Sequence, residues 1–408
     1  MINCALIQNK NRQVLLKCIR SSSRYFSYWN REEYSKDAGK ALLELEERIY
    51  NNRDTNDRKL KHANIVSLSN INDDACQALY KLRDDEKYRS LLAVGQTAEE
   101  IMGQVSREEK DVNVVFVSPG IPNPKDDFLS LIENYSSTLE WIHIRSAGID
   151  FCHSPEWLDF FSSTKGEKIQ VTNAKGQFSS VLAEYAIMSC LYFAKSIPRL
   201  IQQQQNAEWE KFNVLELRGR TIGIIGYGDI GKATAKLAHA LGMKVVALKR
   251  QKNSSISSRS VDEYCSSMFY GQEGLYELLS QSDYVLSCLP LTEQTHHLLD
   301  EKALSQMPVN SVFINLGRGA VVDELALFRF LQSKRIHGAA LDVFAQEPLP
   351  PKHPFWTLPP SQLLMSPHNM DQTATFMHEA TEFFVNENLP RFILNQPLLN
   401  PVNTSQGY

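Results

Sequence analysis

A glycine-rich turn between an apolar run and a helical pattern constrains the fold more than any other feature of this chain. The run begins at Thr221, and the spacing Gly226-x-Gly228-x-x-Gly231 ends it and opens an amphipathic segment over residues 232–241. A second apolar run, residues 244–248, follows at the distance that a βαβ unit requires. In that context the glycines permit a tight turn, expose backbone to a pyrophosphate and let the helix approach the strand. The pattern predicts a nicotinamide dinucleotide site, although the motif taken alone is equally a turn that binds nothing.

Length and composition indicate a protein of two ordinary domains. The chain has 408 residues, 43% of them hydrophobic, and no apolar run reaches the roughly 20 residues of a membrane helix. The net charge is −4 and no basic stripe appears in the body of the chain, so nucleic acid is not an expected partner. Seven scattered cysteines without C-x-x-C spacing predict reduced thiols, with no disulfide framework and no metal site.

The first 31 residues are basic and contain no acid. Six of them are Lys or Arg, and they include the serine cluster Ser21-Ser22-Ser23. This composition is typical of a mitochondrial transit peptide, and Arg24-Tyr25-Phe26-Ser27 resembles a cleavage site. A basic tail on a cytoplasmic protein, or a wrongly assigned start codon, is the alternative. Residues 32–62 are dense in charge and predict a peripheral helix or linker.

Short apolar runs alternate with helical patterns through the rest of the chain. The expected strands are residues 65–69, 112–118, 141–145, 169–172, 244–248, 284–289, 311–315 and 338–343. A long apolar helix over 179–200 would connect two groups of strands, and a helix over 374–392 would return to the first group. Such alternation predicts an α/β fold of two doubly wound parallel-sheet domains, Rossmann-like and flavodoxin-like, with a cleft between them. We expect a substrate domain over residues 63–195, completed by 368–408, and a dinucleotide domain over 196–367.

The end of the strand after the glycine turn indicates which dinucleotide is preferred. A carboxylate there would bond the ribose 2′-hydroxyl of NAD(H), whereas an arginine accepts the 2′-phosphate of NADP(H). The sequence instead reads Lys249-Arg250-Gln251-Lys252, without a carboxylate. We therefore expect NADP(H), with Arg250 making a bidentate contact. The alternative is a solvated basic turn in a protein that also accepts NAD(H).

Three polar side chains follow apolar runs late in the chain, namely Arg318, Glu347 and His368. An arginine offers a planar fork to a carboxylate or carbonyl, and an imidazole beside a carboxylate donates a proton to a developing oxyanion. Together they suit the reduction of a 2-oxo acid. Singly, each has an ordinary alternative: a surface ion pair, a turn carboxylate and a partly buried histidine with a structural partner.

The combination resembles the D-isomer-specific 2-hydroxyacid dehydrogenases over about residues 112–408. The matching blocks are Trp141-Ile-His-Ile-Arg-Ser-Ala-Gly-Ile-Asp150, Val171-Thr-Asn-Ala174, Ala183-Glu-Tyr185, the Gly226 turn, Leu289-Pro-Leu-Thr292, Asn315-x-x-Arg-Gly319, Asp342-Val-Phe with Glu347-Pro348, and Ser366-Pro-His368. The resemblance implies that His368 is the acid in reduction and the base in oxidation, that Glu347 pairs with it, and that Arg318 holds the substrate. It also implies a carboxylate site at the backbone amides of Ala147, Gly148 and Ile149.

The same resemblance implies a cofactor site, in which Asp342 contacts the nicotinamide carboxamide while Leu289 and Pro290 line the adenosine side. The implied cofactor-binding residues are Gly226, Tyr227, Gly228, Asp229, Ile230, Gly231, Lys249, Arg250, Leu289, Pro290, Thr295, Leu316, Gly317, Arg318, Asp342 and His368.

Within the family, the chain looks most like the NADP-dependent glyoxylate/hydroxypyruvate reductases, because of Arg250, the block ending at Asp150 and the terminal Gly407-Tyr408. A homodimer is implied as well. Reductases of larger 2-oxo acids that use NAD(H), and non-catalytic dinucleotide-sensing corepressors, remain alternatives. The family commonly has small residues after the histidine, whereas Asn369-Met370-Asp371 follow here. This departure bears on the nicotinamide contact and on substrate size.

Overall fold

The computed structural model describes residues 61–80, 82, 91–105, 111–152, 154–250, 263–373 and 375–405. The predicted transit peptide, the linker up to residue 60, Gln251-Lys252 and Gly407-Tyr408 lie outside these residues. Lys61, at the end of the predicted linker, donates its backbone N–H to the carbonyl of Ile393 at 3.1 Å.

A five-stranded parallel sheet forms the first domain, in the order β2-β1-β3-β4-β5. Its strands are β1 (Ile65–Leu68), β2 (Leu91–Gly95), β3 (Val114–Val117), β4 (Trp141–Ile144) and β5 (Gln170–Asn173). Nearly all of their residues are buried, since helices cover both faces of a parallel sheet. Most of these strands therefore appear in the sequence as short, mainly apolar runs, whereas β5 has the polar sequence Gln170-Val-Thr-Asn173. The strand β2 was not predicted, because Leu, Ala and Gly in five residues suit a helix as well as a strand.

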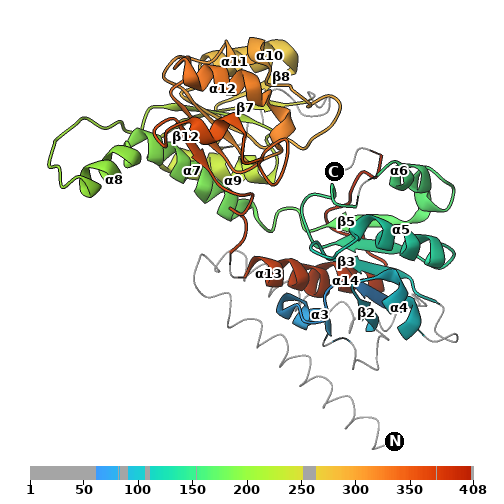
Figure 1. The fold of residues 1–408 in the computed structure, drawn as a ribbon. Coiled ribbons are helices and arrows are strands. Elements are labelled where there is room, and N and C mark those ends of the chain that lie inside the picture. Colours follow the sequence, from blue (N-terminus) through green and yellow to red (C-terminus); the bar gives the residue numbers. More distant parts are fainter. Residues whose placement is uncertain are drawn as a thin grey trace, which may run out of the picture. The chain divides into compact units, whose positions relative to one another are not determined.

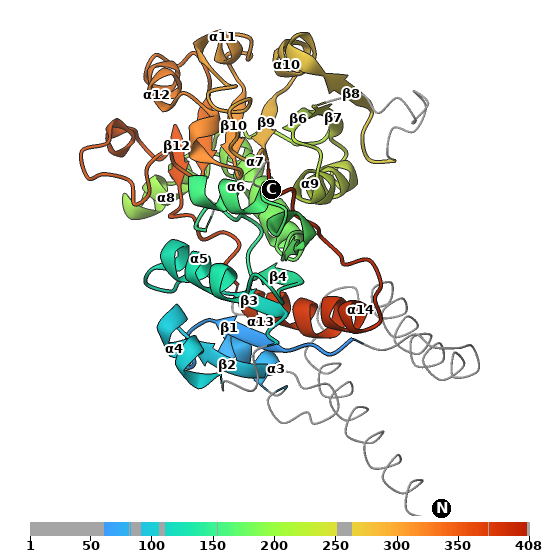
Figure 2. The same cartoon turned by 90° about the vertical axis from the view of Figure 1, so that its right-hand side faces the viewer.

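Helices from both ends of the described chain cover this sheet. They are α3 (Gln77–Tyr80), α4 (Ala98–Gln104), α5 (Pro124–Tyr135), α6 (Pro155–Phe161), α13 (Phe376–Phe383), the π-helix Phe384–Asn388 and α14 (Leu389–Ile393), with 3₁₀ turns at Asp74–Cys76 and Gly166–Lys168. Figures 1 and 2 show the red C-terminal helices α13 and α14 beside the first sheet. The ring of Phe384 stacks on Trp141 with centroids 4.9 Å apart, and Leu389 is buried in the same cluster. The predicted return of the C-terminal segment to the first group of strands is therefore confirmed.

The predicted helix over residues 179–200 is two helices, α7 (Ser179–Ala194) and α8 (Ile197–Gln205). Between them Ser196 has a left-handed backbone, with φ of 51°. Pro198 contributes to the break, because it lacks the N–H that would bond the carbonyl of Ala194 in a continuous helix. The proline lies in the first turn of the second helix, where no N–H is needed.

A seven-stranded parallel sheet forms the second domain, in the order β12-β11-β10-β9-β6-β7-β8. Its strands are β6 (Thr221–Ile225), β7 (Lys244–Lys249), β8 (Ser267–Tyr270), β9 (Tyr284–Ser287), β10 (Val312–Asn315), β11 (Gly338–Leu341) and β12 (Leu363–Met365). The chain winds outward from β6 to β8 and then crosses to β9 on the other side of β6. Ligands of such sheets bind at this reversal, beyond the carboxyl ends of the strands. The short edge strands β8 and β12 were not predicted.

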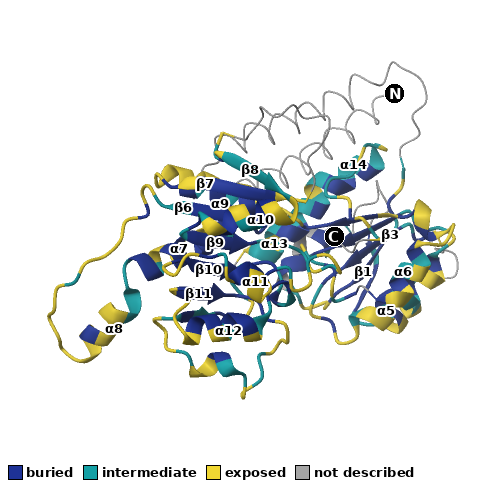
Figure 3. Ribbon diagram, turned by 90° about the horizontal axis from the view of Figure 1, so that it is seen from above, coloured by how far each residue is buried: buried dark blue, intermediate teal, exposed yellow. Residues whose placement is uncertain are grey.

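Two apolar clusters lie on opposite faces of the second sheet. One contains α7 and α9 (Asp229–Ala240), and the other contains α10 (Gly271–Ser280), α11 (Glu301–Leu304) and α12 (Glu324–Gln332). Two 3₁₀ turns, Gly319–Val321 and Pro354–Thr357, complete the elements of this domain. Figure 3 shows the inner strands as buried and the edge strand β8 as intermediate, with exposed residues on the helices. The described part of the chain contains no helix with the length and apolarity to span a bilayer. The α/β fold class of two parallel-sheet domains is confirmed.

Candidate active site

The glycine turn between β6 and α9 has the geometry that a dinucleotide requires. Gly226 has φ of +100°, a backbone conformation that favours glycine. A Cβ atom on Gly231 would lie 2.5 Å from the carbonyl oxygen of Gly226, so this glycine permits the close contact of helix and strand. A Cβ on Gly228 would meet nothing within 4 Å, which leaves open space at the N-terminus of α9. The turn therefore fits a pyrophosphate held by helix N–H groups.

The basic end of β7 lies beside this turn. Lys249 and Arg250 are both exposed, and the ammonium group of Lys249 lies 5.6 Å from the centre of the Tyr227 ring. Tyr227 is the buried residue between the first two glycines, so its ring links the turn to the strand end. The two cations stand where an adenosine ribose would be contacted.

The loops after β9 and β10 touch each other. A Cβ on Gly317 would overlap the backbone oxygen of Leu289, so glycine is required for these loops to approach. Thr295 donates its hydroxyl to the carbonyl of Pro290 at 2.7 Å and accepts the N–H of Thr292 at 2.8 Å. These contacts close the 290–295 loop beside buried Leu316, the first residue after β10.

Arg318 follows β10 and binds the carboxylate of Asp150, a residue to which the sequence analysis assigned no role. Its Nε and Nη2 donate to Oδ2 of Asp150 at 3.1 and 2.5 Å, and Nη1 donates to the carbonyl of Gly317 at 2.8 Å. Three of the five guanidinium N–H groups are thus engaged, and two remain for a substrate oxygen. The block ending at Asp150 was noticed for its family pattern, but its spacing alone does not reveal an ion pair with a residue 168 positions away.

The predicted substrate loop, residues 147–149, leads to Asp150. A Cβ on Gly148 would overlap the Arg318 guanidinium, so the loop approaches this cation through a glycine. The side-chain amide of Asn173 donates to the carbonyl of Ala147 at 2.7 Å, and the Ser146 hydroxyl donates to that of Gly148 at 2.6 Å. Because two carbonyls of the loop are bound in this way, its conformation is fixed, and Ile149 is buried beneath it.

Glu347 and His368 form a hydrogen-bonded pair. Oε2 of Glu347 lies 2.7 Å from Nδ1 of His368, and Oε1 accepts the backbone N–H of Phe344 at 2.9 Å. The hydrogen bond that His368 donates to the Glu347 carboxylate raises the pKa of His368, against the opposing effect of burial. Burial is the largest single effect and acts to raise the pKa of Glu347. The hydrogen bonds to His368 and to the Phe344 N–H, with the charges of His368 and Arg318, together outweigh burial, and the net pKa is lowered. With Nδ1 engaged, Nε2 is the nitrogen of His368 that can exchange a proton with a substrate.

The loop that bears Glu347 is held at two further points. The carboxylate of Glu324, the first residue of α12, accepts the N–H of Ala345 at 2.8 Å and lies 3.5 Å from Nε2 of His353. A Cβ on Gly319 would overlap the backbone of Phe344, so the loop after Arg318 packs directly on the Glu347 loop. These contacts fix the Glu347 loop against the loop that follows β10.

Asp342 is the first residue after β11 and is buried. Its Oδ1 accepts the Ser366 hydroxyl at 2.7 Å and the N–H of Asn369 at 3.1 Å, while its Oδ2 accepts the N–H of Met370 at 3.4 Å. Burial raises its pKa, and these hydrogen bonds oppose the shift. Asp371, in the segment that departs from the family pattern, has a pKa raised by burial and lies within the electrostatic influence of His368 and Arg318.

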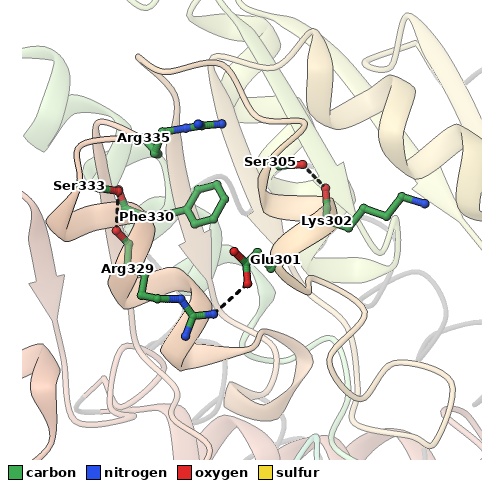
Figure 4. A pocket seen from close by; sticks show the side chains of 7 residues that line it. All are labelled: Glu301, Lys302, Ser305, Arg329, Phe330, Ser333 and Arg335. Carbon is green, nitrogen blue, oxygen red and sulfur yellow. Dashed lines mark hydrogen bonds and ion pairs between the residues drawn. The ribbon is translucent and has the colours of Figure 1, made fainter.

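A surface hollow of about 570 Å³ lies elsewhere on the second domain. It is lined by residues of α11 and α12 and of the turns that follow them, including an ion pair of 3.0 Å between Glu301 and Arg329 (Figure 4). None of its lining residues belongs to the predicted site. The candidate active site is therefore the set of loops at the carboxyl ends of the strands and not this hollow.

Comparisons with known proteins agree with this placement. Residues 187–369 match the model of the NAD-binding domain of the D-isomer-specific 2-hydroxyacid dehydrogenases. The structure of one such dehydrogenase from Xanthobacter autotrophicus, in complex with NADPH, covers 85% of this chain and is itself covered completely, with 26% identity and a TM-score of 0.67. By sequence the chain thus resembles this family over residues 187–369, and by fold over most of its length.

Two curated relatives illustrate the range of similarity. Glyoxylate/hydroxypyruvate reductase B of an Enterobacter species is 36% identical over 208 residues, which are 49% of this chain and 61% of that protein. The alignment thus spans less than two thirds of that relative. A glyoxylate/hydroxypyruvate reductase of Arabidopsis thaliana is 27% identical over 78% of this chain and 91% of its own length.

The structure brings together most residues that the sequence analysis singled out, and their roles stay predictions. Glu347 binds His368 directly, whereas Arg318 is hydrogen-bonded to Asp150 and reaches the pair only through electrostatic influence. Asp150, Ser366 and Tyr185 were not assigned roles from the sequence. All three stood inside matched blocks, Ser366 as the first residue of the block that ends at His368.

Proposed function

We propose that this protein reduces a small 2-oxo acid, of the glyoxylate or hydroxypyruvate kind, to the D-2-hydroxy acid with NADPH. The observation that carries the proposal is the hydrogen bond between Glu347 and His368, at the strand ends of a sheet that also bears the dinucleotide turn. The names of the curated relatives support the substrate class. The exposed cations Lys249 and Arg250 support the choice of NADP(H), with NAD(H) as the other cofactor to test.

The proposed roles follow from the atoms that remain available. When bound, the dinucleotide supplies a hydride to the carbonyl carbon of the substrate. Arg318 offers its two remaining N–H groups to the substrate carboxylate or carbonyl, and the loop amides of residues 147–149 share the carboxylate. His368 gives the proton on Nε2 to the carbonyl oxygen, which completes the hydroxyl group. Glu347 stabilises the imidazolium before that transfer and keeps the ring oriented.

The test is the initial rate of NADPH and NADH oxidation by the purified protein without residues 1–31. Glyoxylate, hydroxypyruvate, pyruvate and phenylpyruvate are the substrates, and His368→Gln is the matched variant. We expect turnover of NADPH with the small oxo acids and loss of at least a hundredfold in the variant. A preference for phenylpyruvate with NADH would instead assign the protein to reductases of larger oxo acids. Dinucleotide binding without turnover on any oxo acid would favour a sensor protein and contradict the proposal.

We propose that a second copy of this chain covers the apolar surface of α8 and the segment that follows it. Trp209 is 96% exposed there, and Ile201, Val214 and Leu215 are about half exposed. Figures 1 and 3 show this segment extending from the end of α7 with mostly exposed residues. Since contiguous exposed apolar side chains mark association surfaces, we expect a homodimer by light scattering. A Trp209→Ser variant should shift the protein towards monomer, and a wild-type monomer at micromolar concentration would contradict the proposal.

We also propose that residues 1–31 direct the protein to mitochondria, because the segment is rich in Arg and Ser and lacks acids. A fluorescent protein fused behind residues 1–31 should localise to mitochondria. A fusion in which the six basic residues are replaced by Gln should stay in the cytoplasm. Cytoplasmic fluorescence from both fusions would refute the proposal.

A further inference from the structure

We propose that Tyr185 and Ser366 are positioning residues that hold the Asp342 carboxylate in place for the nicotinamide carboxamide of the cofactor. The inference rests on the proposed function and on the contact between Asp342 and that group which the family resemblance implies. It assigns roles to two buried hydroxyl groups that neither bind substrate nor transfer the reacting proton.

The register of the sheet places Ser366 beside Asp342. Leu341 of β11 pairs with Met365 of β12, so the next residue of each chain segment, Asp342 and Ser366, leaves the sheet at the same level. The hydroxyl of Ser366 then donates to Oδ1 of Asp342 at 2.7 Å. Oδ1 also accepts the N–H of Asn369 at 3.1 Å, while Oδ2 receives only the longer bond from Met370 at 3.4 Å. Oδ2 is therefore the oxygen with more remaining capacity to accept an amide N–H.

Tyr185 extends this contact to α7. Its hydroxyl lies 3.0 Å from the Ser366 hydroxyl, and the side chains of Tyr185, Ser366 and Asp342 are all buried. A serine hydroxyl has one hydrogen, which Ser366 gives to the ionised carboxylate, because a carboxylate accepts only. Ser366 must then accept from Tyr185. The direction of both hydrogen bonds is therefore fixed: Tyr185 donates to Ser366, and Ser366 donates to Asp342.

These two hydrogen bonds matter because Asp342 is a buried acid. Burial raises the pKa of Asp342, and the bond from Ser366 is foremost among the interactions that oppose this shift. Without that bond, the carboxylate would lose both an orienting contact and part of what keeps it ionised. Tyr185 acts one step further away, by fixing the rotation of the Ser366 hydroxyl.

A purely structural role for these hydroxyl groups, as ties between α7 and the sheet, makes different predictions. Tyr192 provides the matched control, since it lies on the same helix and donates its hydroxyl to the carbonyl of Pro360 at 3.0 Å. Tyr192→Phe removes the same atom from the same helix, at a more exposed hydrogen bond that does not lead to Asp342. If these hydroxyl groups only linked α7 to the sheet, Tyr185→Phe and Tyr192→Phe would change the Kd of NADPH equally.

The experiment measures the Kd of NADPH and of 2′-phospho-ADP-ribose, which lacks nicotinamide, by titration calorimetry. We expect Ser366→Ala to raise the Kd of NADPH about tenfold and Tyr185→Phe about threefold, with Tyr192→Phe unchanged. The Kd of the analogue should not change in any variant. Because Tyr185 acts through Ser366, the double variant should match Ser366→Ala alone. The loss in Ser366→Ala should also grow as the pH falls.

Three results would overturn the inference. The first is wild-type affinity for NADPH in both Ser366→Ala and Tyr185→Phe. The second is an equal loss for NADPH and for the analogue, and the third is additive losses in the double variant. Should Ser366→Ala fail to fold, Tyr185→Phe, which removes one oxygen, decides the matter alone. If the wild-type protein binds no dinucleotide, the proposed function fails too, whereas normal wild-type turnover with unaffected variants refutes this inference only.

Discussion

Replacing Glu347 by Gln tests how the carboxylate acts on His368. The substitution keeps the shape of the side chain and removes its charge, while the 2.7 Å contact with Nδ1 of His368 can persist through the amide oxygen. Because the hydrogen bond that His368 donates to the Glu347 carboxylate is the main cause that raises the pKa of His368, that pKa should fall in the variant. Reduction needs the imidazolium and oxidation needs the neutral ring. The alkaline limb of the reduction profile and the acid limb of the oxidation profile should therefore both move to lower pH.

The size of the effect on kcat follows from the exposure of the pair. A hydrogen bond to a charged partner contributes about 1.5–3 kcal/mol when it is shielded from water. The side chains of His368 and Glu347 are 42% and 36% exposed, so solvent screening reduces the contribution to about 1 kcal/mol. At about 1.4 kcal/mol for each factor of ten, kcat for reduction at neutral pH should fall about fivefold.

The assay is steady-state NADPH oxidation and NADP⁺ reduction from pH 5 to pH 10, with Glu301→Gln as the control. Glu301 forms an ion pair of 3.0 Å with Arg329 on the surface hollow, so this variant makes the same chemical change away from the site. The control should keep the wild-type profile. The proposed effect of Glu347 on His368 is refuted if the alkaline limb of the reduction profile and the acid limb of the oxidation profile stay in place in Glu347→Gln. It is also refuted if these two limbs move in opposite directions.

Three further predictions follow from the same geometry. Arg250→Ala should raise KM for NADPH at least tenfold more than KM for NADH in steady-state assays, and equal changes would refute the assignment of the 2′-phosphate. Gly228→Ala should leave the Tm unchanged, because its Cβ meets no protein atom, and should raise the Kd of NADPH at least tenfold, because that Cβ enters the space for the pyrophosphate. Gly231→Ala should lower the free energy of unfolding in urea by about 1–3 kcal/mol, because its Cβ overlaps the Gly226 carbonyl. The pair of Glu347 and His368 should stabilise the fold most between about pH 4.3 and 6.5, where both groups are charged.

The sign of the last prediction follows from the two pKa shifts. The pKa of His368 is raised in the folded protein, so its contribution is complete below the unfolded value and is lost as the pH rises through the folded one. The pKa of Glu347 is lowered, so its contribution is lost as the pH falls through that value. The Tm difference between wild type and Glu347→Gln should shrink towards pH 9 and towards pH 3. A difference that is constant with pH would contradict the pairing.

The sequence predicted the elements whose patterns are strong and local. The turn from Gly226 to Gly231 predicts both the strand before it and the helix after it. The apolar runs at residues 284–289 and 311–315 are long enough to identify buried parallel strands. The edge strands β8 and β12 have three or four residues and fewer buried positions, so no period distinguishes them from loops. The left-handed Ser196 shows that a proline inside an apolar pattern marks a new helix as readily as an end.

The site divides in the same way. Arg318, Glu347 and His368 were recognisable because each follows an apolar run inside a matched block. Their partners were not, because the pairing of Arg318 with Asp150 and of Tyr185 with Ser366 joins residues more than 160 positions apart. Such contacts depend on strand order and loop path, which no local pattern contains. Charge and hydrogen-bonding capacity were visible in the sequence. Of the pairings, the family resemblance implied that of Glu347 with His368, and the partners of Arg318 and Tyr185 were not predicted.

The most direct test of the central claim is a single turnover of NADPH bound in stoichiometric amount to the protein, followed at 340 nm after mixing with hydroxypyruvate. The product is analysed by chiral chromatography, and the reaction is repeated with His368→Gln. We expect the wild type to lose absorbance at 340 nm rapidly and to form D-glycerate. In the variant, NADPH should stay bound and unreacted. Bound NADPH that no oxo acid consumes in the wild type, or equal turnover in the variant, would contradict it.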